Sequence, residues 1–79
     1  MHLGERILRR RTKLGLSQRA LARQVGTPQP VISNLERGRR DEITASLLKR
    51  FAEALHCTTD YLVGMHEDED SEQLAALAS

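Results

Sequence analysis

The chain has 79 residues, enough for one small domain but not for two. It holds one Phe, one Tyr and no Trp, so a hydrophobic core must be aliphatic. No run approaches the roughly 18 apolar residues of a membrane span. The start, MHLGERILRRR, lacks the apolar stretch of a signal peptide, and the single Cys57 excludes an intramolecular disulfide. These features predict a cytoplasmic domain with no membrane partner.

The net charge of +1 hides a strong asymmetry along the chain. Residues 1–50 carry all twelve Lys and Arg against four acids, whereas residues 51–79 carry seven acids and no Lys or Arg. A basic block followed by an acidic end suggests a body that binds a polyanion and a solvated or partner-facing tail. Ordinary solubility charge, sorted by accident, explains the same numbers.

The apolar spacing predicts five helices and no strand. The first covers residues 3–14, with Leu3, Ile7, Arg11 and Leu14 on one face and Leu8 beside it, and Gly15 ends it. The second covers 18–25, with a cap at Ser17 and with Leu21, Ala22 and Val25 turned inward.

The third helix poses a question, because its start contains two prolines. Thr27 is expected to cap it, and it runs to about residue 35 or 37 before Gly38. The first N–H groups of a helix have no partner inside the helix, so Pro28 and Pro30 mark its start rather than break it. Since Gln29 also precedes a proline, the alternative is a start nearer Pro30.

Two more helices complete the expected domain. After a loop over RRDEI, Thr44 caps a helix at about 45–55, whose inward stripe is Leu48, Phe51, Ala52 and Leu55. A short helical turn follows from Thr58 or Thr59 through Val63, and Gly64 closes a domain of residues 1–65. Residues 66–79, with the acidic run HEDED and then SEQLAALAS, are expected to form a linker and a short tail with helix propensity.

The second and third predicted helices are separated by a short turn containing Gly26. Two helices joined in this way form a helix-turn-helix, here at about 17–36. The segment GLSQRALARQVG, the later PVISNLERG and then FAEAL resemble the phage repressor and Cro-like (XRE-type) helix-turn-helix family. The resemblance covers residues 6–64. It implies an all-α, five-helix lambda-repressor-like domain that works as a symmetric dimer on a palindromic operator, with the helix at about 28–36 in the major groove.

The resemblance also implies roles for individual residues. It places five residues against base edges: Pro28, Gln29, Pro30, Ser33 and Asn34. The two prolines offer only apolar contact, for example to a thymine methyl, while Gln29 and Asn34 suit adenine. The bland alternative is that Gln29 and Asn34 are merely exposed to solvent.

Contacts to phosphate are expected from Gln18, Thr27, Arg37, Arg39 and Arg40. Weaker candidates are Arg9, Arg10, Arg19 and Arg23, which a solvated helix face explains equally well. The loop RRDEIT lacks the proline that the family often carries there, which weakens the assignment of Arg39 and Arg40.

Arg11 falls on the apolar face of the first helix, where an unpaired charge is costly. By resemblance it pairs with Glu36 as a structural clamp; the alternative is that its stem leans out to solvent.

His56 and Cys57 point apart on a helix end and have no second pair at ligand spacing, so no metal and no cofactor is expected, and Cys57 is interpreted as a buried thiol. No nucleophile motif or paired carboxylates indicate an enzyme.

The sequence therefore predicts a dimeric, double-stranded-DNA-binding transcriptional regulator, with a repressor favoured. The alternative is an antitoxin or a restriction-modification controller-type protein whose segment 66–79 binds a protein partner. A third reading is the DNA-binding part of a longer regulator.

Overall fold

The computed structural model describes residues 3–64, and within this range it is all helical. The five helices are α1 (Leu3–Lys13), α2 (Gln18–Val25), α3 (Gln29–Glu36), α4 (Ala45–Leu55) and α5 (Thr59–Leu62). The predicted fold class is thus confirmed, and the loop expected over RRDEI separates α3 from α4. The predicted tail, residues 66–79, lies outside the described residues. No helix of residues 3–64 is long and apolar enough to cross a membrane.

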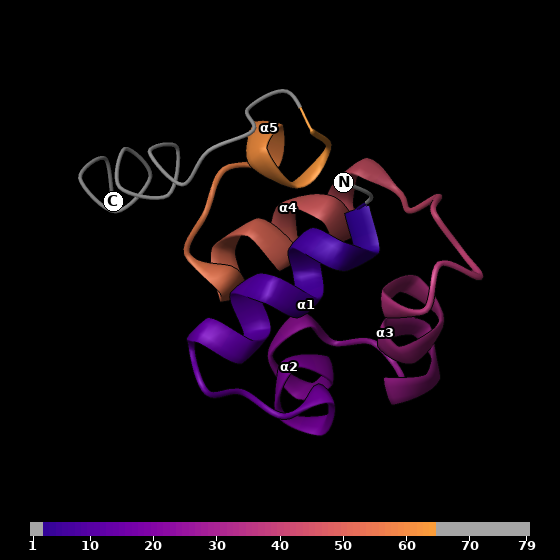
Figure 1. The fold of residues 1–79 in the computed structure, drawn as a ribbon, viewed down its shortest axis with the longest axis vertical. Coiled ribbons are helices and arrows are strands. Elements are labelled where there is room, and N and C mark those ends of the chain that lie inside the picture. Colours follow the sequence, from indigo (N-terminus) through magenta and orange to yellow (C-terminus); the bar gives the residue numbers. More distant parts are fainter. Residues whose placement is uncertain (1–2, 65–79) are drawn as a thin grey trace.

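A single core joins all five helices. Figure 1 shows α1 and α4 lying side by side, with α2 and α3 on one side of the pair and α5 on the other. Most of the core residues are aliphatic, as predicted, and the two aromatic residues, Phe51 and Tyr61, are buried among them. The remaining buried apolar residues are Ile7, Leu21, Ala22, Val25, Ile32, Leu35, Ala52, Leu55, Cys57 and Leu62. The expectation of a buried Cys57 thiol is therefore confirmed.

Two of the predicted N-caps, Ser17 and Thr44, are present, and Thr58 caps the short α5 in the same way, because each cap depends only on a hydroxyl and the backbone just after it. Ser17 Oγ accepts from the Ala20 N–H at 3.0 Å, Thr44 Oγ1 from Leu47 at 3.1 Å, and Thr58 Oγ1 from Tyr61 at 3.0 Å. Each cap residue has the extended backbone that this position needs.

The predicted cap of α3 is wrong. The N-cap is Pro28, with φ −63° and ψ 146°, and no side chain caps the helix. The proline ring fixes the φ that an N-cap adopts here, Pro30 brings no N–H that needs a partner, and the Val31 N–H donates to the Pro28 carbonyl at 3.1 Å. With these two prolines the helix begins without a capping hydroxyl, and Thr27 lies outside the helix.

The buried face of α1 also differs from the prediction. Leu8 and Leu14 are exposed, whereas Arg6 and Arg10 are only 1% and 5% exposed. Arg6 Nη1 donates to the Tyr61 carbonyl at 2.9 Å, and its guanidinium lies 5.2 Å from the centre of the Tyr61 ring. The apolar pattern missed this face because two of the inward residues are arginines.

Candidate nucleic-acid interface

The turn between α2 and α3 fixes the angle at which α3 leaves the core. Gly26 has φ 80°, a left-handed conformation that glycine adopts without strain, and its N–H donates to Ala22 O at 2.8 Å. The Thr27 N–H donates to the same carbonyl at 3.0 Å. Ile32 and Leu35 then anchor α3 in the core, so the opposite face of α3 is turned outward.

The residues predicted to read bases lie on this outward face. Pro28, Gln29 and Pro30 are exposed at the start of α3, and Ser33 and Asn34 are half-buried one turn later. Pro28 is the N-cap of α3 and the other four residues lie in this short helix, whose buried side is fixed by the core. Such a surface offers amide, hydroxyl and apolar groups within a width that a major groove admits.

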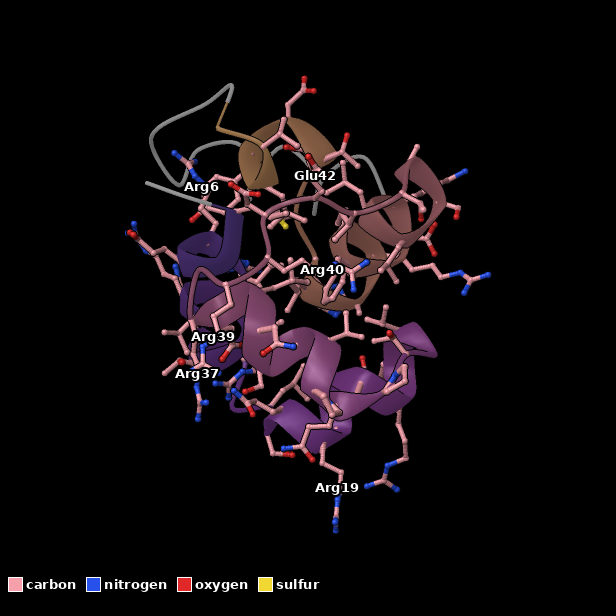
Figure 2. All side chains as sticks on the ribbon, turned by 90° about the vertical axis from the view of Figure 1, so that its right-hand side faces the viewer. Arg6, Arg19, Arg37, Arg39, Arg40 and Glu42 are labelled. Atoms are coloured by element: carbon pink, nitrogen blue, oxygen red, sulfur yellow. The ribbon has the colours of Figure 1, made fainter. Side chains whose placement is uncertain are left out.

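Exposed arginines flank this face. In Figure 2, which views the molecule from the side of α3, Arg37 and Arg39 project on one flank of α3, and Arg19 projects beyond α2. Arg37, Arg39 and Arg40 are all exposed, while Thr27 is half-buried in the turn. Arg40 Nε also donates to the Glu42 carbonyl at 3.0 Å, so this arginine holds the loop as well as facing solvent. The loop residues 39–44 line a shallow hollow.

The structure shows that the prediction of Arg10 as a weaker candidate for phosphate contact is wrong. Its Nε and Nη2 donate to Leu55 O at 3.0 and 2.8 Å, and Nη2 donates to His56 O at 3.2 Å. These bonds satisfy carbonyls at the end of α4, which the αL conformation of His56 terminates. Arg10 is therefore a buried support of the fold and not part of the basic surface.

The predicted pair of Arg11 and Glu36 is present and has bidentate geometry. Arg11 Nε lies 2.7 Å from Glu36 Oε2, and Arg11 Nη2 lies 3.0 Å from Oε1. Arg11 Nη1 also donates to the Leu16 carbonyl at 2.8 Å. The hydrogen bond to Glu36 raises the pKa of Arg11 above its ordinary value. The clamp ties α1 to the end of α3 and to the loop before α2.

Sequence reasoning missed a connection from this clamp to the outward face. Gln18 Nε2 donates to Glu36 Oε1 at 2.9 Å, and Gln29 Nε2 donates to Gln18 Oε1 at 3.3 Å. One signal was available: pairing Arg11 with Glu36 brings the end of α3 close to the turn before Gln18. Among residues 3–64, no three His, Cys, Asp or Glu side chains gather where they could hold a metal ion.

Comparison with known proteins matches this arrangement. The family described as Helix-turn-helix (HTH_3) matches residues 7–62. An uncharacterized transcriptional regulator in the ATPase CF(0) region of Rhodospirillum rubrum is 45% identical over 60 residues, which cover 76% of the chain. Repressor protein C2 of Salmonella phage P22 is 41% identical over 77% of the chain, and the regulator ImmR of Bacillus subtilis is 37% identical over 85%. The matches span 55%, 28% and 52% of these three relatives.

Two solved structures share the fold. The P22 c2 repressor in complex with a synthetic operator superposes with a TM-score of 0.75 at 38% identity, covering 80% of this chain and 94% of that one. A SinR–SinI complex superposes with a TM-score of 0.75 at 25% identity, covering 96% of this chain and 77% of that one.

Proposed function

Because the chain belongs to the Helix-turn-helix family, we propose that it is a sequence-specific DNA-binding regulator of transcription, in the repressor role, that inserts α3 into the major groove. The observation that carries this proposal is the outward face of α3. Gln29 is exposed at the start of a helix whose back is fixed in the core, Ser33 and Asn34 lie half-buried one turn later, and exposed arginines flank this face. The names of the relatives, a phage repressor and two transcriptional regulators, support the same function.

We assign two kinds of contact to the face. Gln29 and Asn34 read base edges by hydrogen bonds, Ser33 takes either role, and Pro28 and Pro30 give apolar contact. Phosphates are bound by Gln18, Thr27, Arg37, Arg39 and Arg40, which position the helix without reading sequence. Because two of the five reading positions lack hydrogen-bonding side chains, part of the specificity rests on DNA shape.

The operator is proposed to be a palindrome bound by a homodimer. Two-fold symmetry of the protein places two copies of α3 in successive major grooves, so the half-sites lie about one helical turn apart. The similar P22 c2 repressor was solved in complex with a synthetic operator, which supports the binding of an operator.

Selection of bound duplexes from random DNA tests the proposal. Wild type is expected to enrich a palindrome, and Gln29→Ala to lose preference at one base pair in each half-site, since a bidentate contact gives about 1–3 kcal/mol of discrimination. Gln24→Ala is the matched control, because Gln24 is an exposed glutamine of α2 outside the reading set. Binding by wild type with no enriched sequence would overturn the proposal.

A further inference from the structure

A continuous chain of hydrogen bonds runs from the core to the reading face. Arg11 holds both carboxylate oxygens of Glu36, whose side chain is only 5% exposed. Gln18 Nε2 donates to Glu36 Oε1 at 2.9 Å, and Gln29 Nε2 donates to Gln18 Oε1 at 3.3 Å. The chain ends on the residue to which we assign base readout.

The carboxylate of Glu36 fixes the direction of the two hydrogen bonds that lead from it to Gln18 and Gln29. An ionised carboxylate can only accept hydrogen bonds, so the amide of Gln18 must face Glu36 with its NH₂ group. Its carbonyl oxygen is thereby turned toward Gln29, which must in turn approach with its own NH₂ group. Rotating either amide by half a turn would set two acceptors against each other, and that arrangement loses a hydrogen bond.

We propose that Glu36 is a positioning residue for base readout, acting through Gln18 to fix which way the Gln29 amide points. One N–H of Gln29 is used by Gln18, and the second N–H and the carbonyl oxygen are left for the base. This pair matches adenine, which offers an acceptor at N7 and a donor at N6. The inference rests on the proposed function, since it concerns how the reading face is set.

The experiment compares base preference in variants that change the chain of bonds with a variant that only lowers stability. The operator and the base pair read by Gln29 are first taken from the selection experiment. Dissociation constants are then measured at 10 °C for that operator and for the three operators altered at that base pair. The readout is the ratio of the altered constants to the original one.

Glu36→Gln is the main variant, because an amide can donate as well as accept and no longer dictates the orientation of Gln18. We expect its discrimination ratio to fall about fivefold, the effect of losing one oriented hydrogen bond. Arg10→Met is the matched control: it removes bonds to carbonyls at the end of α4 and none to a residue of the reading face, so it lowers stability and leaves the ratio unchanged. An unchanged ratio in Glu36→Gln would overturn the inference.

Gln18→Met keeps the inference testable if Glu36→Gln does not fold, because it leaves the pair of Arg11 and Glu36 intact. Its ratio is expected to fall as well, and adding Glu36→Gln to it is expected to change stability but not the ratio. A wild-type ratio in Gln18→Met would overturn the inference, since Gln18 is the link from Glu36 to Gln29. Absence of any enriched operator for wild type would instead overturn the proposed function.

Discussion

Gly4 of α1 lies against the backbone of the last turn of α3, and Gly4→Ala tests that contact. A Cβ at this position would lie 1.6 Å from the Leu35 carbonyl oxygen, 2.5 Å from the Leu35 carbonyl carbon and 3.1 Å from the Glu36 Cα. All three are backbone atoms of the last turn of α3, so no side chain can move aside to make room. Either α3 shifts away from α1, or the first turn of α1 unwinds and gives up the packing of Leu3.

Two opposing effects set the size of the change. Alanine favours a helix over glycine by about 1 kcal/mol, which would stabilise an unhindered site. Overpacking costs typically about 1–3 kcal/mol and sometimes more, and a contact as short as that to Leu35 belongs at the upper end. We therefore expect a net loss of about 2 kcal/mol in the free energy of unfolding. For a domain of this size that lowers Tm by about 10–15 °C.

Urea and thermal unfolding followed by far-UV circular dichroism measure this effect. Gly15→Ala is the control, because Gly15 has φ 72° but no atom within 4 Å of an added Cβ. It should lose only the backbone strain of about 1 kcal/mol. If Gly4→Ala were as stable as wild type, or more stable, the close approach of α1 and α3 would be refuted.

Four variants test the assigned roles in fold and function. Arg10→Met should cost about 3 kcal/mol in unfolding experiments, because it leaves the carbonyls of the α4 end without their charged donor, yet the salt dependence of DNA binding should not change. Arg39→Gln should leave the stability unchanged and make the slope of log K against log salt shallower by about two in a dimer. An unchanged slope would show that Arg39 does not contact phosphate. Ser17→Ala should lose about 1 kcal/mol of stability, whereas Thr27→Ala should lose almost none, since Ser17 caps α2 and Thr27 caps no helix; equal losses would contradict the assigned caps.

The sequence predicted the elements whose signals are local. Ser17 and Thr44 each cap a helix through an N–H three residues further on, so spacing along the chain was sufficient to predict both caps. Thr27 is also a hydroxyl residue directly before a helical pattern, but Pro28, which follows it, takes the N-cap position. The residue type of a candidate cap therefore predicts the N-cap position less well than the backbone conformation that the following residue permits.

The buried arginines of α1 show why the rest could not be predicted. Arg6 bonds a carbonyl 55 residues away and Arg10 one 45 residues away, so no pattern within α1 reveals their partners. Arg11 could be paired with Glu36 only through the family resemblance. The resemblance did not indicate a bond from Gln18 to Glu36, although this bond follows once the clamp is in place.

These buried bonds also change how the charge of the chain should be interpreted. Twelve Lys and Arg in residues 1–50 suggest a strongly basic body, but Arg6, Arg10 and Arg11 bond to groups inside the fold. The salt dependence of binding counts the phosphates that are neutralised and not the net charge of the protein. With about six phosphates contacted per dimer, the slope of log K against log salt should lie near −5. A much steeper slope would mean that α1, α2 or α4 also contributes arginines to the interface.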